Sequence, residues 1–218
     1  MTRILALTVA VLAAAAVTAA QPVTRQPVTR ADVLGTVGWL SARLPDASSY
    51  DRWENGIASV AAGAGWYWTD HLKTEIEAGL ISTARFYAPN VVVVNGVPLY
   101  GTSRYDIDSR VLAVVQQYQF YRNVWFHPHL GAGVELTWEE TRRADEPLYG
   151  YDPLTRGSRG VFQPGVFPAV TEVVARPFGQ IGFKAYLTQR TFFRLDLRIG
   201  FRDEIESALL RAGVGVDF

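Results

Sequence analysis

Apolar and polar residues alternate along this chain, and the alternation is clearest between Thr191 and Phe218. In the first half of that stretch one set of alternate positions is apolar: Phe193, Leu195, Leu197, Ile199 and Phe201. The intervening positions are polar or small: Arg194, Asp196, Arg198, Gly200 and Arg202. Because successive side chains of a β-strand point to opposite faces, we predict a strand with one apolar and one charged face. A second such strand, joined near residues 203–206, reaches Phe218.

The same alternation predicts six earlier strands, at residues 33–44, 57–68, 72–85, 109–121, 124–139 and 172–187. The register of the first is ambiguous, because Val37 and Trp39 compete with Leu34 and Leu40 for the outer face. The connections after the second, fourth and sixth strands are short. Those after the first, third and fifth are long, and we expect loops at residues 88–108 and 140–171. The run Val91–Val94 could extend a hairpin above the barrel.

Two folds can use such strands. A soluble periplasmic carrier of the lipocalin type would bury the apolar faces, whereas a membrane barrel would turn them towards lipid and enclose the charges. A transmembrane barrel has short turns at one end and longer connections at the other. The sorted connections therefore favour an all-β fold, an eight-stranded antiparallel up-and-down transmembrane β-barrel, and the soluble carrier stays as the alternative.

Composition narrows the possibilities further. The 218 residues contain 21 Lys and Arg against 21 Asp and Glu, so no basic field points to nucleic acid. Cysteine is absent, which excludes disulfides, thiolate catalysis and a lipid-modified N-terminal cysteine. Residues 1–20 combine Arg3, an apolar segment and small residues, as a signal peptide does. We expect a lead-in at residues 21–31, where QPVTR occurs twice, and the barrel at residues 32–218.

These features together resemble the small eight-stranded outer-membrane barrels of Gram-negative bacteria, of the opacity-protein and outer-membrane-protein-A transmembrane-domain type. The resemblance rests on the export signal, the strand and connection pattern, and the final residues VGVDF. It implies a monomer in contact with outer-membrane lipid. It also implies that Phe218 is the aromatic signal read by the barrel assembly machinery during biogenesis.

The predicted inner faces carry ten charged residues: Lys73, Glu75, Glu77, Glu135, Lys184, Arg194, Asp196, Arg198, Arg211 and Asp217. Eight strands leave an interior that side chains just fill, and buried charges must be paired. Five acids and five bases make a structural salt-bridge network feasible. An ion path or a catalytic pair is the alternative reading.

His127 and His129 face the same way on one predicted strand and could hold a metal if a carboxylate joined them. Pro128 lies between them and no third ligand is evident, so we interpret them as lumen filling and predict no metal and no cofactor. A lipid-modifying enzyme is a further alternative. However, the long outer connections contain no histidine, and we predict that the protein is not an enzyme.

Aromatic residues fall into two groups. One group lies near the short turns, where an interfacial girdle is expected: Trp66, Trp68, Tyr118, Phe120, Trp125, Phe126, Phe192 and Phe193. The other lies in the long connections: Tyr100, Tyr105, Tyr149, Tyr151 and Phe162. Tyrosine is frequent at interfaces, so the second group favours a structural or surface-interaction role with a possible surface ligand.

Overall fold

The structure is a computed structural model that describes residues 30–43, 53–94, 97–120, 125–152, 157–162, 165–202 and 204–218. Its strands are β1 (Ala31–Arg43), β2 (Trp53–Tyr67), β3 (Leu72–Val94), β4 (Val97–Gln119), β5 (Phe126–Asp145), β6 (Leu148–Asp152), β7 (Gly157–Phe162), β8 (Val170–Tyr186), β9 (Thr191–Phe201) and β10 (Ile205–Asp217). The predicted signal peptide, the lead-in up to residue 29 and most of the first connection lie outside the described residues. Within the described ranges, no helix is long and apolar enough to cross a membrane.

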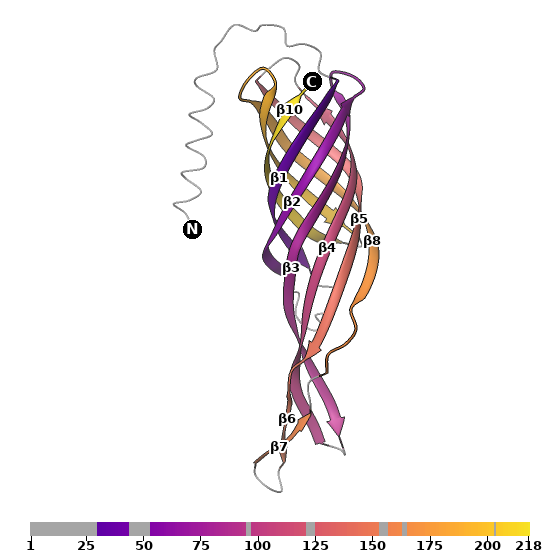
Figure 1. The fold of residues 1–218 in the computed structure, drawn as a ribbon, viewed down its shortest axis with the longest axis vertical. Coiled ribbons are helices and arrows are strands. Elements are labelled where there is room, and N and C mark those ends of the chain that lie inside the picture. Colours follow the sequence, from indigo (N-terminus) through magenta and orange to yellow (C-terminus); the bar gives the residue numbers. More distant parts are fainter. Residues whose placement is uncertain are drawn as a thin grey trace, which may run out of the picture.

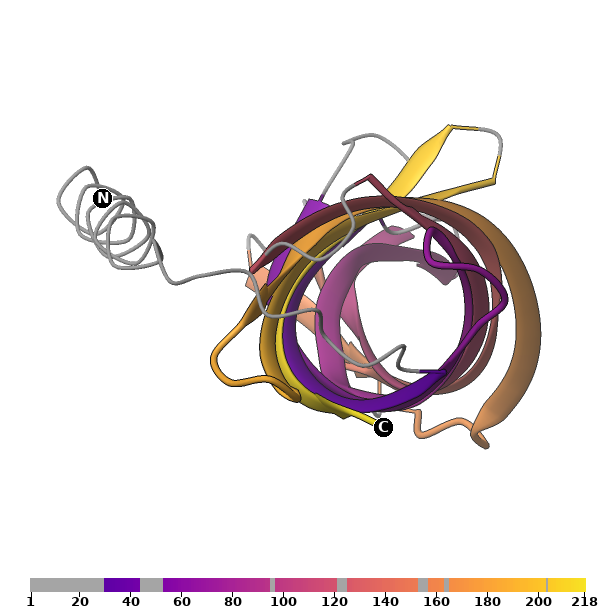
Figure 2. The same cartoon turned by 90° about the horizontal axis from the view of Figure 1, so that it is seen from above.

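Eight strands close into an antiparallel barrel (Figures 1 and 2). Each pairs with the next in the order β1, β2, β3, β4, β5, β8, β9, β10, and β10 returns to β1 with Val33 opposite Val216. β6 and β7 stand apart at one end, where β6 pairs with β4 through Tyr149 and Tyr100. The predicted all-β, eight-stranded, up-and-down antiparallel barrel is therefore confirmed.

The apolar face of each barrel strand points outwards. Trp39 on β1, Ile76 on β3 and Ile181 on β8 are 57 %, 55 % and 56 % exposed, while Arg194 and Arg198 on β9 are 2 % and 4 % exposed. The same alternation settles the register of β1, because Val37 and Trp39 face outwards and Leu34 is buried inside. A soluble carrier needs the opposite orientation, with apolar side chains inside, so the structure contradicts that alternative.

Arg30 and the C-terminal Phe218 lie at one end of the barrel, where the Arg30 amide donates a hydrogen bond to the Phe218 carbonyl. The connections β2–β3, β4–β5 and β8–β9 turn at this same end (Figure 1). The remaining connections lie at the far end. We refer to the part of β3, β4 and β5 beyond Ile81, Ser109 and Glu139, together with β6 and β7, as the extension.

The extension corrects the predicted loops at residues 88–108 and 140–171. β3 and β4 continue as one long hairpin whose last pair is Val94 and Val97, and β5 stays paired with β4 as far as Asp145. β-branched and aromatic residues favour strand, and pairing satisfies the backbone groups that a loop would leave to water. Pro89 is tolerated because β2 no longer pairs with β3 there, so the proline lies on an edge strand.

Two seams of the barrel stop early. β2 pairs with β3 only up to Ser59 and Ile81, although β2 itself continues to Trp53 beside β1. β8 pairs with β9 only up to Phe178 and Gly200, although β8 continues to Val170 beside β5. At the extension end, the wall is thus made of two separate groups of strands.

We predict that Gly182→Ala destabilises the barrel. A Cβ at Gly182 would lie 2.4 Å from the carbonyl oxygen of Leu195 and 2.5 Å from the Asp196 Cβ. Forced overpacking of this kind costs about 1–3 kcal/mol. The measurement is the free energy of unfolding in urea, with the folded form followed by its heat-modifiable gel migration. Gly35→Ala is the control, since its Cβ would meet nothing within 4 Å. Equal effects of the two changes would contradict the prediction.

Candidate functional site

The ten charged residues singled out in the sequence all lie on the inner surface of the barrel. Their side chains come from β3, β5, β8, β9 and β10. Nine are buried, and the side chain of Glu135 is 13 % exposed. They form two layers, one near the chain ends and one at mid-height, which we call the end layer and the middle layer.

The end layer contains two lysines and two aspartates. Lys73 Nζ donates to Asp32 Oδ2 at 2.8 Å, and Lys184 Nζ donates to Asp217 Oδ1 at 2.5 Å. The hydroxyl of Tyr67 donates to Asp32 Oδ2 at 2.8 Å and accepts from Lys184 Nζ at 3.0 Å. The two aspartates are direct neighbours across the β1–β10 seam, so both lysines are needed to neutralise them.

Asp32 was not among the predicted site residues. It precedes a strand whose register the sequence leaves ambiguous, and one acid at a strand end carries no distinct signal. The pairing of Val33 with Val216 is what places Asp32 opposite Asp217 on the inner face. The strand-end tyrosines Tyr67 and Tyr186 were also not assigned to the site, although both hydroxyls bond to these aspartates.

The middle layer is built on three arginines. Arg194 Nη1 donates to both Glu75 oxygens at 2.7 and 2.8 Å, and its Nε donates to Asp196 Oδ2 at 2.7 Å. Arg211 bridges Asp196 Oδ1 at 2.8 Å and Glu77 Oε2 at 2.7 Å. Arg198 also bonds to Glu77, and its Nη1 lies 3.6 Å from Glu135 Oε2. Each arginine therefore contacts two carboxylates.

These contacts cross the lumen. Glu75 and Glu77 belong to β3, whereas Arg194, Arg198 and Arg211 belong to β9 and β10, which are not neighbours of β3 in the barrel. Charge-assisted hydrogen bonds between such distant strands tie opposite walls together. Inside a low-dielectric barrel, a charge that lost its partner would be costly.

Two phenylalanines complete the filling. The Phe178 ring lies 3.9 Å from the Arg198 guanidinium carbon, and the Phe192 ring lies 3.8 Å from Lys184 Nζ. Phe192 is fully buried in the lumen. Its assignment to the interfacial girdle is therefore wrong. It alternates with the outward Phe193 and so follows the strand period rather than the local run of aromatics.

His127 and His129 also face inwards. The His127 ring packs edge-on to Tyr186 at 5.2 Å between centroids, and Nε2 of His129 lies 3.5 Å from Gln180 Nε2. In the parts of the chain that the structure describes, no group of three or more His, Cys, Asp or Glu side chains is placed to hold a metal.

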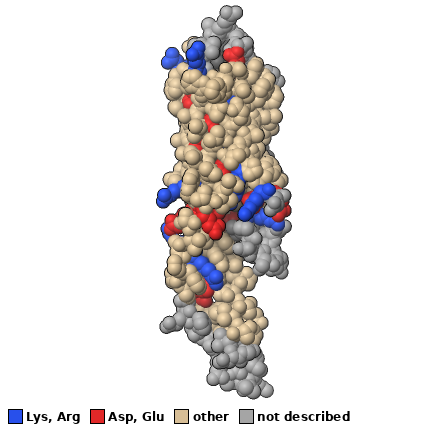
Figure 3. Space-filling view, turned by 90° about the vertical axis from the view of Figure 1, so that its right-hand side faces the viewer, with Lys and Arg blue, Asp and Glu red and all other residues tan. Residues whose placement is uncertain are grey.

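On the face that Figure 3 shows, charged residues gather across the base of the extension, and we call them the charged belt. Arg85 Nε donates to Asp106 Oδ1 at 2.6 Å, and Arg142 donates to Glu140 at 2.8 and 3.0 Å. The hydrogen bond from Arg85 holds the pKa of Asp106 below its ordinary value. The Arg85–Asp106 pair therefore stays charged at neutral pH, and the belt marks where the apolar outer surface of the barrel ends.

Comparison with known proteins identifies the fold. No protein-family model matches the sequence, and no curated protein matches it. Neisserial surface protein A matches with a TM-score of 0.55 and 15 % identity over 86 % of this chain and 97 % of that one. The N-terminal β-barrel domain of Pseudomonas aeruginosa OprF matches with a TM-score of 0.51 and 13 % identity, over 87 % of this chain and 98 % of that one.

A third solved structure, the outer membrane protein OprG of Pseudomonas aeruginosa, matches with a TM-score of 0.50 and 11 % identity. That match covers 89 % of this chain and 99 % of OprG. The chain therefore has the fold of the small outer-membrane β-barrels. The resemblance inferred from the sequence is confirmed at the level of the fold.

We predict that breaking one middle-layer pair destabilises the protein more than breaking an exterior pair. Arg194→Met leaves Glu75 with Lys73, which also serves Asp32, as its ion-pair partner, and should cost about 3–5 kcal/mol of unfolding free energy. The double variant Glu75→Gln with Arg194→Met should recover part of the loss, because Glu75 then carries no charge that needs the missing arginine. The free energy of unfolding of the wild type, the single variant and the double variant is measured by urea titration in lipid vesicles.

The matched control is Arg85→Ala, which removes an exposed ion pair with Asp106 and should leave stability unchanged. If Arg194→Met and Arg85→Ala unfolded at the same urea concentration, the lumen network would have no stabilising role.

Proposed function

We propose that this chain is a monomeric protein of the bacterial outer membrane, with a lumen sealed by paired charges and an extension outside the cell. One observation carries the proposal: apolar side chains cover the outside of a closed barrel whose charges are enclosed. Burial of apolar surface in lipid favours that arrangement, and water would oppose it. The fold of the proteins it resembles agrees with the same location.

A structural role follows from the lumen network. The end and middle layers place ion pairs across the interior of an eight-stranded barrel, which has little room to spare. We infer that the ten charged residues together with Asp32 stabilise and close the barrel rather than conduct ions. A plug of paired side chains has no continuous aqueous path for solute.

A surface-interaction role is supported by the extension. Val91, Tyr100 and Tyr149 form a row across β3, β4 and β6, and each is more than half exposed. Exposed tyrosines beside an apolar side chain suit the recognition of a protein surface. Tyr105 is less available, because its ring stacks on Phe86 at 4.8 Å between centroids. The side chains of Tyr151 and Phe162 lie outside the described residues.

We favour a non-enzymatic role over lipid modification. All three histidines lie at the end of the barrel that carries the C-terminus: His71 in the β2–β3 turn, and His127 and His129 at the start of β5. A lipid-modifying site in the outer leaflet would need its general base near the extension. Phe218, exposed at the end of β10, remains our proposed contact for the barrel assembly machinery.

We predict that the protein fractionates with outer membranes and that protease added to intact cells cuts between β6 and β8. That segment belongs to the end that we place outside the cell. A protease site inserted into the β2–β3 turn is the control and should be cut only after the cells are lysed. Recovery in the soluble periplasmic fraction, or cleavage of both sites in intact cells, would contradict the proposed location or topology.

We also predict little conductance for the purified protein in planar lipid bilayers, because paired side chains fill the lumen at two heights. A variant that removes charges from the middle layer, Glu77→Ser with Arg198→Ser and Arg211→Ser, should conduct more. Single-channel recording measures the conductance of the wild-type protein and of the variant. Large, steady currents from the wild-type barrel would show that the lumen is a pore.

A further inference from the structure

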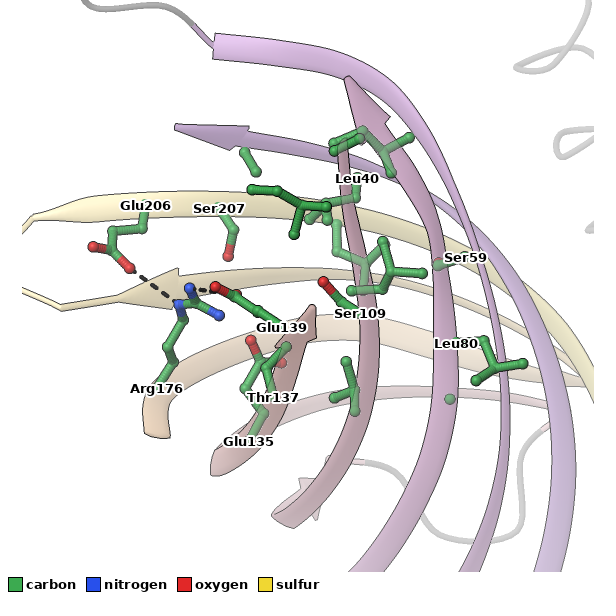
Figure 4. A pocket seen from close by; sticks show the side chains of 18 of the residues that line it. Leu40, Ser59, Leu80, Ser109, Glu135, Thr137, Glu139, Arg176, Glu206 and Ser207 are labelled. Carbon is green, nitrogen blue, oxygen red and sulfur yellow. Dashed lines mark hydrogen bonds and ion pairs between the residues drawn. The ribbon is translucent and has the colours of Figure 1, made fainter. Parts of the chain in front are cut away.

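The lumen is not filled along its whole length. Beyond the middle layer, towards the extension, lies a cavity of about 480 Å³ (Figure 4). Glu77, Arg198 and Arg211 form its floor, and Leu40, Ile57 and Leu209 are among its apolar walls. Its size falls within the range of small-molecule sites, about 300–1,000 Å³, which also combine apolar walls with a few polar groups.

The floor carries buried polar atoms without partners. Among the described residues, Glu77 Oε1, Thr137 Oγ1 and Arg198 Nε have no hydrogen-bond partner, although Glu77, Thr137 and Arg198 are only 4 %, 2 % and 4 % exposed. All three residues line the cavity. Glu135 stands in the same row as Glu77, separated by the small Ala113 on β4. Two of these atoms, Glu77 Oε1 and Thr137 Oγ1, can accept hydrogen bonds from a ligand group that donates them.

The walls also carry an excess of negative charge. The described lining residues include five carboxylates (Glu77, Glu135, Glu139, Glu172 and Glu206) against four guanidinium groups (Arg43, Arg176, Arg198 and Arg211). Arg176 is shared by Glu139 at 2.7 Å and Glu206 at 3.1 Å, as Figure 4 shows. Arg211 is shared between Glu77 and Asp196, a residue below the cavity. The cavity is therefore complementary to a cation.

A second hollow adjoins this cavity on the side of the outer surface. A groove of about 780 Å³ lies where the β2–β3 seam stops, and it shares five lining residues with the cavity: Ser59, Val60, Leu80, Ile81 and Ser109. On its outer side the groove has apolar Val60, Leu80 and Trp138 beside charged Asp108 and Arg110. The groove therefore lies at the boundary between the apolar outer surface of the barrel and the charged belt, which is the height where the head groups of amphiphiles lie.

We propose that the cavity binds a single-chain amphiphile with a cationic head, such as a primary alkylammonium, which reaches it from the membrane between β2 and β3. The ammonium donates to Glu77 Oε1, Thr137 Oγ1 and Glu135, and the hydrocarbon chain packs along Leu40, Ile57 and Leu209. The lateral route rests on the proposed membrane location, whereas the complementarity of the cavity for the ligand does not.

Binding is tested with the full barrel in nanodiscs of zwitterionic lipid, with isoleucine methyl groups labelled for NMR. Ile57 and Ile107 line the cavity, and Ile76 and Ile181 face outwards. Decylammonium should shift the Ile57 and Ile107 signals saturably, and decanoate should bind about tenfold more weakly or not at all. The proposal would be overturned if the Ile57 signal shifted only as much as the outward-facing Ile76 signal at every decylammonium concentration. Equal affinity for decanoate and decylammonium would also overturn it.

The carboxylate contribution is tested by Glu135→Gln, which should weaken decylammonium binding about fivefold or more, as expected for a hydrogen bond to a charged group. Glu146→Gln is the matched control, because Glu146 is an exposed acid at the extension that does not line the cavity. Equal affinities in the two variants would show that the floor acids do not select the ligand.

The lateral route is tested with a disulfide that closes the seam. Ala58 and Ser82 are the next residues beyond the last pair, Ser59 and Ile81, and the Ala58 amide donates to Ser82 Oγ at 3.1 Å. The protein has no cysteine, so only Ala58→Cys with Ser82→Cys can cross-link. Oxidation should slow access of decylammonium to Ile57 about tenfold, and reductant should restore it.

The control disulfide, Ala62→Cys with Ala78→Cys, joins register partners within the part of the same seam that is already paired, and it should change nothing. Unchanged access in the oxidised Ala58–Ser82 variant would overturn the lateral route. A spin-labelled lipid separates this result from the proposed location, because it broadens the Ile76 and Ile181 signals only if those residues contact the bilayer.

Discussion

Closure of the β1–β10 seam is the constraint on which the rest of this structure depends. Once Val33 is set opposite Val216, every barrel strand has a neighbour on both sides, and each side chain must face either in or out. The period of two then assigns aliphatic and aromatic residues to the outside and ionic residues to the inside. A shift by one residue would exchange the two faces along a whole strand.

Because the interior charges are enclosed, each of them must be neutralised by a partner inside the barrel. In the end and middle layers, Asp32 raises the acids to six (with Glu75, Glu77, Glu135, Asp196 and Asp217), against five cations (Lys73, Lys184, Arg194, Arg198 and Arg211). Arginines therefore serve two carboxylates each, and tyrosine hydroxyls and Gln180 supply further hydrogen bonds. The cost of desolvating each group is offset only because several partners act together. Glu135, which lines the cavity, makes the longest ion pair of these acids, 3.6 Å from Arg198 Nη1.

Much of the fold could be predicted from the sequence, because the alternation of apolar and polar residues in segments such as 191–201 indicates a strand, its two faces and its length together. Tertiary pairing decided the rest. The inward position of Asp32 depends on its pairing with Asp217, and that of Phe192 depends on which alternate residues of its strand face inwards. Residues 88–108 form strand because they pair with one another, which local sequence does not reveal. The cavity has no sequence signal, since Ala113, Thr137 and Ile57 are ordinary residues whose shared property is the space between them.

The seam between β1 and β10 joins the first and last described strands of the chain, residues 31–43 and 205–217. Contacts between residues so far apart in sequence are slow to form, because the intervening chain must first give up its freedom. Until the final strand has been synthesised, β1 has one open edge and Asp32 lacks its neighbour. Ring closure therefore cannot precede the last strand, and the open edge of an intermediate without it favours aggregation.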